Sequence, residues 1–470
     1  MIPRTAVLQG LVTSLTFLCA ACSEPGRVIG QARAELPLPP GLEVGFNHRD
    51  GAHYRSPIQG QWRNGDDLEL QLIKAIDSAE QECLVAVQEL SLPNVSKALI
   101  RAQQRGVRVQ VVLENLYRTP WSQQHEAGLP AHARHRINRL KRLADSNQDG
   151  VLTSDERFNG DAIALLEHGA IPLIDDTEDG SQGSGLMHHK FVVIDRRRVL
   201  TGSANFTSSG IHGDGDAPRT RGNVNHLLSI ESSALAEVFA AEFARMWGDG
   251  PGGKPDSQFG RGKGAHSPQR VQVGEVAITV LFAPHAKGDS RHGLKRIARE
   301  LGDAQSRIDM ALFVFSAQEL ANVLQERGQQ GVQIRLLADP GFASRPFSEV
   351  LDLLGIAMPD RDCKLEANNR PFAVPLKGVG TPQLARGDKL HHKFAVIDNK
   401  TVITGSFNWS PSAAHTNDET LLVIESPQLA KHFTREMERL WRGAELGITQ
   451  RMRSKLNKRI RVCGSGIERS

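Results

Sequence analysis

The sequence predicts an α/β protein built from two related domains. An apolar segment at 83–87, a helical stretch and a second apolar segment at 106–114 recur further along the chain, at 308–312 and 331–339. Two apolar strands joined by a helix at this close spacing are typical of a βαβ unit in a sheet that is covered on both faces. Because the whole unit recurs, we expect the two domains to share one descent and one fold.

A segment rich in glycine and proline separates the two copies. Residues 248–269 contain seven glycines and three prolines, a composition typical of a linker. The chain length of 470 residues, about three times that of a typical domain, also favours more than one domain. We therefore expect a first repeat at 51–247, a second repeat at 270–447 and a basic tail at 448–470.

Composition excludes several classes of protein. Apolar residues make up 39% of the chain and charged residues 23%, which is too apolar for a disordered protein. The net charge of +4 comes from the segment 450–470, which holds seven basic side chains and one acidic one, so the rest of the chain carries −2. This balance argues against a protein that coats nucleic acid. Five cysteines without metal-ligand spacing exclude a disulfide scaffold and a zinc ribbon.

The N-terminus has the features of an export signal. Arg4 precedes a mostly apolar stretch that ends in small residues around Cys22, so we expect a signal peptide at 1–21 and a linker at 22–50. Ala-Ala-Cys at 20–22 resembles the lipobox of bacterial lipoproteins, although a cysteine stands where that pattern prefers leucine. We expect lipidation of Cys22 and attachment to the cell envelope or periplasmic membrane surface; the alternative is a plain secretory signal.

The other cysteines carry a weaker expectation. Cys83, Cys363 and Cys463 show no pairing pattern, and we expect them to be unpaired. An oxidising compartment would allow one bond, so that alternative stays open.

The most informative pattern is a doubled motif. His188 and Lys190 stand at the start of one apolar strand, and His391 and Lys393 stand at the start of another. Because side chains at i and i+2 share one face of a strand, each histidine points with its lysine, whereas His189 points away.

Each copy continues with the same two features. Asp195 and Asp398 end the apolar strands, and a Gly-Ser-x-Asn segment follows each of them, with Asn205 and Asn408 as the amides. Imidazole, ammonium and amide groups that converge on one point suit a phosphoryl oxyanion, because they supply charge stabilisation and a nucleophile or acid near neutral pH.

These residues resemble the signature of the phospholipase D superfamily, which the chain carries twice, within residues 51–447. The resemblance implies two pseudo-symmetric domains, each a mixed sheet flanked by helices, with the active site at their interface. It also implies hydrolysis of a phosphodiester through a phosphohistidine, with no cofactor for the chemistry. The residues it assigns to the site are His188, Lys190, Asn205, His391, Lys393 and Asn408. Asp195 and Asp398 match the signature acids, whose role in the family looks structural.

A difference between the copies predicts which histidine attacks phosphorus. Glu419 lies downstream of His391 in the same repeat and resembles the family's downstream carboxylate, so we expect it to hold the other nitrogen of that ring. Asn225 aligns with Glu419 in the first copy and would hold His188. A carboxylate raises the pKa of imidazole and suits a general acid, whereas an amide leaves the ring neutral. We therefore expect His188 to be the nucleophile and His391 the general acid.

An alternative partner remains open for the first copy. The segment between His188 and Asn225 is longer than its counterpart in the second copy, and the insertion includes Asp214 and Asp216. Either of these could supply the missing carboxylate.

A calcium-binding loop is expected where the first copy is longer. Residues 145–156 match the EF-hand consensus, with oxygen ligands at positions 1, 3, 5 and 12 and glycine at position 6. Residues 132–144 and 157–168 can form the flanking helices. The expected ligands are Asp145, Asn147, Asp149, the carbonyl of Val151, and Glu156. Because the loop is single, we expect calcium to be structural rather than regulatory.

Two substrates remain in competition. Export and a near-neutral body favour a glycerophospholipid, whose headgroup ester would be hydrolysed to give phosphatidate at a membrane surface. The alternative is an endonuclease acting on single-stranded DNA or RNA, since the tail at 448–470 could bind phosphates or anionic headgroups. Loops at 117–121 and 342–347 carry aromatic and arginine side chains that suit either substrate. A non-enzymatic scaffold is disfavoured because both signatures are intact. We expect a monomer, because one chain holds both motifs.

Overall fold

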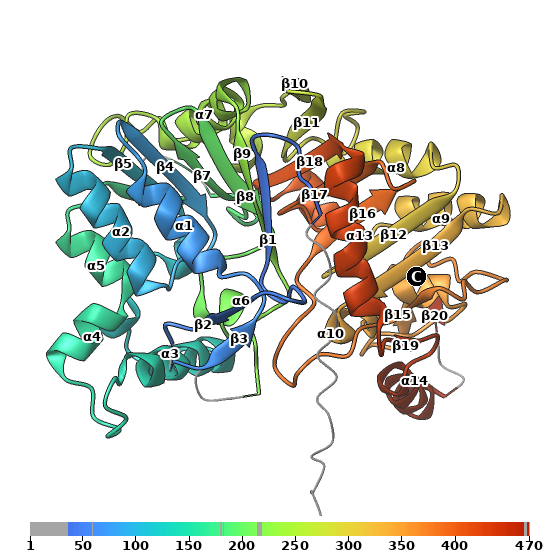
Figure 1. Ribbon diagram of the computed structural model, residues 1–470. Coiled ribbons are helices and arrows are strands. Elements are labelled where there is room, and N and C mark those ends of the chain that lie inside the picture. Colours follow the sequence, from blue (N-terminus) through green and yellow to red (C-terminus); the bar gives the residue numbers. More distant parts are fainter. Residues whose placement is uncertain are drawn as a thin grey trace, which may run out of the picture. The chain divides into compact units, whose positions relative to one another are not determined.

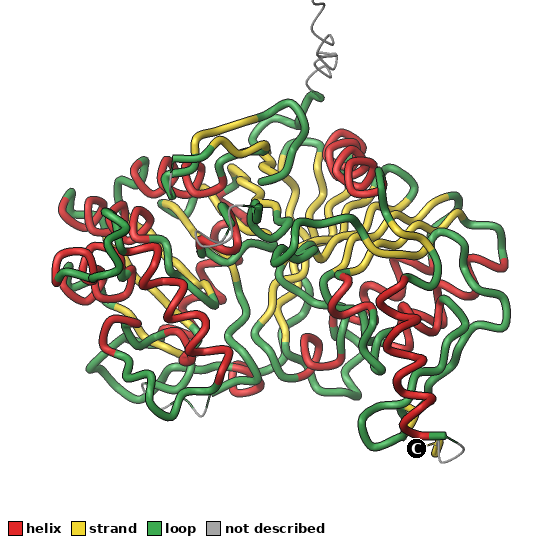
Figure 2. The backbone as a smooth tube through the Cα atoms, turned by 90° about the horizontal axis from the view of Figure 1, so that it is seen from below, coloured by secondary structure: helices red, strands yellow, loops and turns green. Residues whose placement is uncertain are grey.

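The computed structural model describes residues 36–58, 60–178, 181, 183–213, 219–464 and 468–469 (Figure 1). The expected signal segment and Cys22 lie outside the described residues, as do Asp214 and Asp216. Within the described part of the chain, no helix is both long and apolar enough to cross a bilayer. The structure is α/β, as expected, with two large mixed sheets flanked by helices (Figure 2).

The first repeat forms a seven-stranded sheet in the order β1-β9-β8-β7-β4-β5-β6. The strands β4, β5 and β6 are parallel, and β7 is antiparallel to β4. Helix α2 (Pro93–Gln104) connects β4 to β5, so the expected βαβ unit is present. The strands are β1 (Leu42–Phe46), β4 (Glu82–Val87), β5 (Arg108–Leu113), β6 (Leu173–Asp175), β7 (Lys190–Ile194), β8 (Arg198–Gly202) and β9 (His226–Glu231).

The second repeat forms a nine-stranded sheet in the order β10-β11-β18-β17-β16-β12-β13-β15-β19. Helix α9 (Gln318–Gln329) connects the parallel strands β12 and β13, and β16 is antiparallel to β12, as in the first repeat. The strands are β10 (Gln269–Val273), β11 (Val276–Ala283), β12 (Arg307–Leu312), β13 (Gln333–Ala338), β15 (Val379–Thr381), β16 (Lys393–Ile397), β17 (Thr401–Gly405), β18 (Glu419–Glu425) and β19 (Glu445–Leu446).

Each sheet is buried on both faces because its central strands are apolar at successive positions. In β4, Cys83 and Val85 pack against α1 (Leu68–Asp77), α2 and α5 (Ala162–His168), whereas Leu84 points to the opposite face. The second sheet is covered on its outer face by α8 (Gly293–Gly302) and α9.

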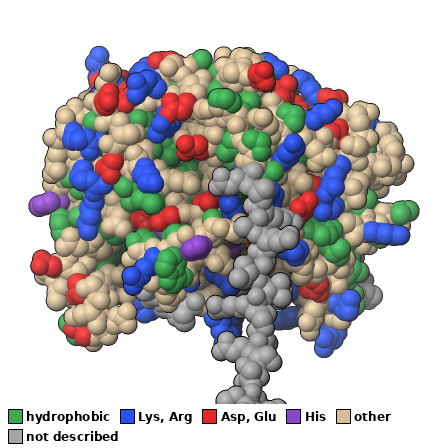
Figure 3. Space-filling view, viewed as in Figure 1, with side chains coloured by type: hydrophobic (Ala, Val, Ile, Leu, Met, Phe, Trp, Pro, Cys, Tyr) green, Lys and Arg blue, Asp and Glu red, His purple; other side chains and the backbone are tan. Residues whose placement is uncertain are grey.

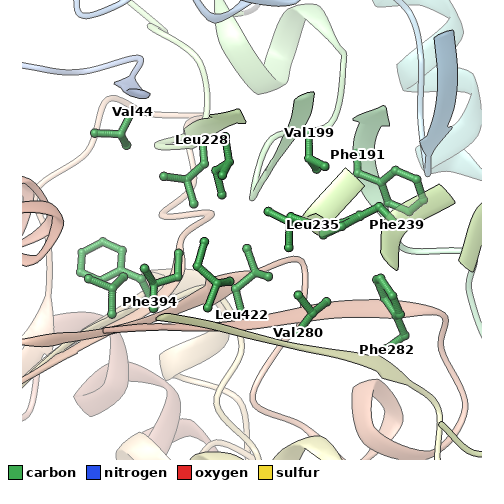
Figure 4. Close-up of a cluster of buried hydrophobic side chains, with 14 of the residues drawn as sticks. Val44, Phe191, Val199, Leu228, Leu235, Phe239, Val280, Phe282, Phe394 and Leu422 are labelled. Atoms are coloured by element: carbon green, nitrogen blue, oxygen red, sulfur yellow. The ribbon is translucent and has the colours of Figure 1, made fainter. Parts of the chain in front are cut away.

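The inner faces of the two sheets share one hydrophobic core (Figure 4). Phe191 and Phe239 enter it from the first repeat, and Phe394 and Leu422 enter it from the second. The buried faces of α7 (Ser233–Trp247) and α13 (Pro427–Trp441) belong to the same cluster. The two repeats therefore pack with their inner faces together, which brings the starts of β7 and β16 to one region.

The insertion in the first repeat forms short helices around its own small core. Helix α3 (Ala131–Ala144) is the expected first flanking helix, and its apolar side packs on Trp121. The expected second helix is split into α4 (Ser154–Gly160) and α5, because the Asp161 side chain accepts hydrogen bonds from the first N–H groups of α5.

The basic tail forms an ordered helix, α14 (Gln450–Cys463), with Met452 buried. A disulfide joins Cys363 to Cys463, so the expectation of unpaired cysteines is wrong for these two, whereas Cys83 is buried and has no disulfide partner in the described part of the chain. The sequence hid this pairing because 100 residues separate the two cysteines, and only the return of α14 over the loop after Met358 brings them together.

The shorter elements complete the chain. They are β2 (His53–Arg55), β3 (Trp62–Asn64), η1 (Asn115–Tyr117), η2 (Trp121–Gln123), α6 (Ser208–Ile211), η3 (Gly260–Lys263), α10 (Pro340–Ala343), α11 (Glu349–Leu353), β14 (Lys364–Leu365), α12 (Pro411–His415) and β20 (Glu468–Arg469). On the face seen in Figure 3, basic and acidic side chains are interspersed, in line with the nearly neutral body of the chain.

Loss of the disulfide is expected to loosen α14. Cys463→Ser should speed tryptic cleavage within this helix, since closing a long loop typically contributes about 2–4 kcal/mol. Cys363→Ser and the double variant should cleave at the same rate as Cys463→Ser, because all three lose the same bond. Proteolysis time courses of these variants would show it, and cleavage at the wild-type rate would mean that packing alone holds α14.

Candidate active site

The two His-x-Lys motifs meet because each is held by a segment of the opposite repeat. The backbone N–H of His188 donates to the carbonyl of Asp418 at 2.9 Å, and that of His391 donates to the carbonyl of Val224 at 3.1 Å. Bridges between Met187 and Asp418 and between Val224 and Leu390 continue this pairing. The site therefore exists only where the repeats are packed together.

His188 is paired with Glu419, not with an amide. Its Nδ1 lies 2.7 Å from Glu419 Oε2, and both side chains are buried. Ser406 donates its hydroxyl to the same carboxylate at 2.6 Å, and Asn417 donates an amide N–H at 3.2 Å. The expectation that Glu419 holds His391 is wrong, because β18 presents its first residue across the interface rather than to its own repeat.

His391 has the amide partner. Its Nδ1 lies 2.9 Å from Asn225 Oδ1, which also accepts the hydroxyl hydrogen of Ser203 at 2.8 Å. The Asn225 amide nitrogen donates to the carbonyl of Gly210 at 2.8 Å, and this fixes the oxygen toward His391. The expected pairing of Asn225 with His188 is therefore wrong as well, and the two pairs are crossed.

The crossed pairs fix the tautomers. A carboxylate only accepts hydrogen bonds, so His188 donates its Nδ1–H and keeps an unprotonated Nε2. Burial lowers the pKa of both His188 and His391 well below the ordinary value, and the nearby lysines lower it further. Burial raises the pKa of Glu419 to about 7, against the opposing effect of Lys190. Both rings are thus neutral in the unliganded site.

The lysines stand beside the histidines, as the strand periodicity predicts. Lys190 donates from Nζ to the carbonyl of His188 at 2.8 Å, and Lys393 does the same to His391 at 2.8 Å. Lys393 Nζ also lies 3.2 Å from His391 Nε2. Burial lowers the pKa of Lys190 to about 7 and that of Lys393 well below its ordinary value.

The Gly-Ser-x-Asn segments have three separate functions. A Cβ at Gly405 would lie 2.2 Å from the carbonyl oxygen of Thr420, so the glycine allows two strands to approach closely. The serines hold the acceptors of the crossed pairs. The Oδ1 atoms of Asn205 and Asn408 are buried and have no hydrogen-bond partner among the described residues, so these amides keep polar capacity for a ligand.

Sequence reasoning missed an asymmetric pair at the ends of β4 and β12. Gln88 accepts from Asn205 at 3.1 Å and lies 3.5 Å from Lys190 Nζ. Phe313, which aligns with Gln88, places its ring 4.7 Å from the ring of His391. One wall of the site is therefore polar and the other is aromatic. The sequence held a signal for this pair, because the residue that directly follows each repeated strand differs between the two copies.

A second missed pair anchors the segments before the motifs. Glu114 accepts the backbone N–H of Met187, and Asp339 accepts that of Leu390 at 3.1 Å. These carboxylates end β5 and β13 in aligned positions, so they restrain the approach to each histidine.

The second histidine of each motif points away from the site, as expected, into a buried polar layer. His189 Nδ1 lies 2.8 Å from the hydroxyl of Thr420, and His392 Nε2 lies 3.0 Å from Glu436. The linker also contributes here, because Lys263 is buried and forms an ion pair with Asp418 at 2.6 Å. Residues 260–263 are therefore part of the interface rather than a free connector.

Asp195 and Asp398 lie at the opposite ends of β7 and β16 from the lysines. Asp398 accepts backbone N–H groups from Gln305, Ser306 and Arg307 at 2.8–2.9 Å. Asp195 accepts the corresponding groups at 80–82. Burial alone would raise the pKa of Asp398, but these hydrogen bonds lower it to about 2. Both acids fix a turn and do not contact the histidines.

The loop at 145–156 has the donor chemistry of a calcium site. Asp145 Oδ1 is buried and unpartnered within the described residues, and Gly150 donates its backbone N–H to Asp145 Oδ2 at 2.9 Å. Hydrogen bonds from Ser146 and Thr153 lower the pKa of Glu156 to about 2. No three histidine, cysteine or acidic side chains of the described chain converge on one point. The oxygen donors fit a hard cation, but the carboxylate of Glu156 already accepts hydrogen bonds as part of the N-terminal cap of α4.

Comparison with known protein families shows the family of this chain. The family model described as "Cardiolipin synthase, PLD-like domain" matches residues 72–247 and 297–441. The chain belongs to this family and thereby to the phospholipase D superfamily.

Similar proteins cover only part of the chain. Over 155 residues it is 30% identical to the mitochondrial cardiolipin hydrolase of Mus musculus. The matched segment covers 32% of this chain and 59% of that protein. It is 29% identical over 140 residues to the phospholipase D of Rickettsia typhi, covering 30% and 58%. The chain thus spans less than two thirds of these relatives.

The fold has a solved counterpart. Phosphatidylserine synthase from Haemophilus influenzae Rd KW20 superposes with a TM-score of 0.54 over 88% of each chain, at 14% identity. This similarity shows the two-domain fold and nothing of the substrate.

Proposed function

We propose that the protein is a phosphodiesterase that hydrolyses the headgroup ester of a glycerophospholipid and releases phosphatidate. The observation that carries this proposal is the pair of crossed contacts, His188 with Glu419 and His391 with Asn225, each beside a buried lysine. Two imidazoles with fixed tautomers beside buried lysines suit this reaction: the neutral ring of one attacks phosphorus, and the other, once protonated in the substrate complex, donates a proton to the leaving oxygen. The names of the relatives support a lipid substrate.

His188 is the proposed nucleophile, for a reason that differs from the one derived from sequence. When Nε2 attacks, a P–N bond forms, the P–O ester bond breaks and the ring becomes cationic. Glu419 stabilises that cation through Nδ1–H, as a carboxylate does for the imidazolium of a hydrolase triad. The crossed pairing thus favours His188 on electrostatic grounds.

His391 is the proposed general acid. Protonated in the substrate complex, it gives its proton to the leaving oxygen, and it then takes a proton from the water that attacks the phosphohistidine. That second step breaks the P–N bond and releases phosphatidate. An amide partner suits this role, because Asn225 orients the ring without raising its pKa and so leaves it a stronger acid.

The lysines and asparagines bind the phosphoryl oxygens in this proposal. Lys190 and Lys393 neutralise the charge that develops on phosphorus, and the amides of Asn205 and Asn408 supply hydrogen bonds. All four side chains are held by the strands and turns described above, so they need little reorganisation during the reaction.

The substrate class is tested by assaying two phosphodiesters side by side. We expect release of the headgroup from phosphatidylcholine vesicles and no cleavage of single-stranded DNA by the same preparation. Lys190→Ala serves as the inactive control, which excludes a contaminating phospholipase. Cleavage of DNA without lipid hydrolysis would instead assign the endonuclease function.

Export is part of the same proposal. The disulfide between Cys363 and Cys463 supports an oxidising compartment, since such bonds are rare in the reducing cytosol. The protein would then act as a monomer at a phospholipid surface, outside the cytoplasm.

Cys22→Ser is expected to release the protein from the membrane fraction, because a lipid anchor would require that thiol. Fractionation and immunoblotting of the wild type and the variant, with Cys19→Ser as the matched control, would measure it. Retention of Cys22→Ser at the membrane would contradict the lipoprotein assignment.

Calcium is proposed to stabilise the insertion without taking part in the reaction. Saturating calcium should raise the melting temperature by several degrees, since a ligand at 100 times its Kd adds about 2.7 kcal/mol. Asp145→Asn should abolish this shift, and Asp155→Asn, outside the ligand set, should keep it. Turnover in chelator should equal that in calcium below the melting range, whereas loss of turnover there would contradict a structural role.

A further inference from the structure

A large cavity lies between the body of the first repeat and its insertion. Its volume of about 870 Å³ falls in the range of about 300–1,000 Å³ that is typical of small-molecule sites. The body contributes the first turns of α1 and α2 together with Ser208, and the insertion contributes side chains between 140 and 160. Helices α3 and α4 of the insertion lie below α2 in the view of Figure 1. Neither catalytic histidine lines this cavity, so it is separate from the site described above.

The first turns of α1 and α2 meet at this cavity because the two helices run side by side in the same direction. Near their C-terminal ends, Arg101 forms an ion pair with Asp77 at 2.8 Å, and Arg105 donates to the carbonyl of Asp77 at 3.0 Å. At the opposite end, Glu69 of α1 and Pro93 of α2 both line the cavity. An acidic side chain and a helix N-terminus therefore face the same space.

Glu69 is buried there with half of its carboxylate unused. The residue is 2% exposed, and its Oε2 lies 2.6 Å from His212 Nε2. The Tyr54 hydroxyl lies 2.8 Å from the other nitrogen of the same ring, which fixes the orientation of the pair. Glu69 Oε1 is buried and has no hydrogen-bond partner among the described residues. Because a buried carboxylate oxygen without a donor is costly, this atom indicates a donor that a ligand supplies.

Ser208 adds a second free group beside this carboxylate. The backbone N–H of His212 donates to the Ser208 carbonyl at 2.8 Å, so the two residues are one helical turn apart and their side chains share one side of the turn. Ser208 is also 2% exposed and lines the cavity, and its hydroxyl has no partner within the described part of the chain. A primary ammonium group has three N–H donors and can satisfy both oxygens.

The start of α2 supplies the opposite charge. The helix begins at Pro93 without a side-chain cap, and the N–H of Asn94 has no acceptor among the residues that the structure describes. Uncapped N–H groups and the helix dipole together attract anions. Lys97 lies one turn further along and lines the cavity, and it has no ion-pair or hydrogen-bond partner in the described chain. This end of the cavity therefore favours a carboxylate or a phosphate.

The second repeat shows that the fold requires neither charge. Glu69 is the second residue of α1, whereas the second residue of α8 is Leu294, which belongs to the apolar core. Lys97 is the fifth residue of α2, whereas the fifth residue of α9 is Asn322. The corresponding helices thus pack in the second repeat without a carboxylate or an ammonium group at these positions. A structural role common to both repeats does not explain Glu69 and Lys97.

The distribution of charge selects the class of ligand. A simple anion would be repelled by Glu69, and a metal ion or a simple amine would leave the N-terminus of α2 and Lys97 unused. The other charged side chains of the lining belong to the insertion and are Arg142, Asp145, Asp155 and Glu156. Asp145 and Glu156 are the proposed calcium ligands, so bound calcium would leave one charge of each sign on that side. A molecule that carries both signs of charge therefore matches the lining best.

We propose that this cavity is a second, non-catalytic binding site for a small zwitterion, a molecule with a primary ammonium group and a carboxylate or phosphate. The ammonium group donates to Glu69 Oε1 and to the Ser208 hydroxyl. The anionic group accepts from the N-terminus of α2 and from Lys97. The site is independent of the proposed lipid hydrolysis, because neither catalytic histidine lines it.

The test is a calorimetric titration of the full-length protein in saturating calcium. Glycine, β-alanine, γ-aminobutyrate and ε-aminocaproate differ in the separation of ammonium and carboxylate, so the tightest of them reports the spacing between the two ends of the cavity. Butylamine and butyrate carry one charge each and should bind about tenfold more weakly than that amino acid, the scale of one charge-assisted hydrogen bond. Its trimethylated form keeps both charges but has no N–H donor, and it should lose affinity to the same extent.

Two further probes distinguish the source of the zwitterion. Phosphoethanolamine has the same ammonium group with a phosphate in place of the carboxylate. If it binds more tightly than every amino acid, and if vesicles of phosphatidylethanolamine capture the protein in a Glu69-dependent manner, the occupant is a lipid headgroup. If the amino acids bind more tightly and the vesicles capture nothing, the occupant is a free amino acid.

Substitutions at the two ends show whether the binding is at this cavity. Glu69→Gln keeps the shape of the side chain without its charge, and Lys97→Gln removes the charge at the other end. Each should raise the Kd of the best zwitterion about tenfold or more. The matched controls Glu80→Gln and Lys74→Gln make the same changes at exposed positions outside the cavity and should keep the wild-type Kd. Circular dichroism checks folding, and Lys97→Gln, at a half-buried position, decides the question if Glu69→Gln does not fold.

The contrary results are equally specific. Absence of binding by all of these zwitterions, or equal Kd values for the wild type, Glu69→Gln and Lys97→Gln, would overturn the proposal. Butylamine that binds as tightly as the best amino acid would mean a site for simple cations, which also overturns it. Because the titration uses no turnover, its result stands whether or not the protein hydrolyses lipid.

Discussion

His188→Asn is expected to lower kcat about 10⁴-fold or more, because removing a nucleophile that acts as part of a unit eliminates most of the catalysis the unit provides. His391→Asn should cost a similar factor with natural lipids, whose alkoxide leaving groups need a proton. Asparagine is smaller than histidine but keeps a polar group in a buried position, so the fold should survive. Circular dichroism and melting curves of both variants check that it does.

The two histidines can be told apart with an activated substrate. A phosphodiester with a nitrophenolate leaving group needs no general acid, so His391→Asn should still form the phosphohistidine and then stall, because the attacking water lacks its base. His188→Asn should form none. Quenching in alkali, which preserves phosphohistidine, followed by peptide mapping would place the phosphate on the peptide that contains His188. Phosphate on His391 in the His188→Asn variant would reverse the assignment.

Glu419→Gln is expected to lower kcat about 10²- to 10⁴-fold with little change in KM, since the carboxylate stabilises charge that appears only during attack. It should also change the pH dependence. The wild-type rate should fall at alkaline pH, where Lys190, whose pKa burial lowers to about 7, loses its charge; at acidic pH it should rise with pH as Glu419, whose pKa burial raises to about 7, ionises. The glutamine variant cannot ionise and should lose that limb.

The matched change on the other ring is Asn225→Asp. It gives His391 a carboxylate, which raises the pKa of that ring and weakens it as an acid, so a smaller loss of kcat is expected than for Glu419→Gln. A larger loss in Asn225→Asp would indicate that the attacking histidine is His391. Rate profiles at acidic, neutral and alkaline pH for the three proteins would separate the two cases.

The repeated strands explain why the fold could be predicted. Segments such as 83–87 are apolar at every position, which is typical of a strand buried on both faces, and the structure buries alternate residues against outer helices and against the shared core. The i and i+2 relation also placed His188 with Lys190 correctly. These features depend on local periodicity, which sequence carries directly.

The partners of the histidines could not be predicted in the same way. Glu419 belongs to the same repeat as His391, yet the ring it contacts is that of His188, far away along the chain in the other repeat. Nothing in the neighbourhood of Glu419 indicates across which interface its side chain points. The disulfide was missed for the same reason, because it depends on where α14 packs. Gln88 and Phe313 could have been found, since each directly follows a repeated strand and the two copies differ there.

The crossed pairs also bear on the origin of the site. In a symmetric homodimer, if residue i of one subunit contacts residue j of the other, then residue j of the first subunit also contacts residue i of the second. His188 with Glu419 and His391 with Asn225 have this reciprocal arrangement, but within one chain. Two identical subunits would have to give both histidines the same neighbour. Joining the copies into one polypeptide removes that constraint, so one ring could keep a carboxylate while the other acquired an amide, and attack and protonation could be assigned to different histidines permanently.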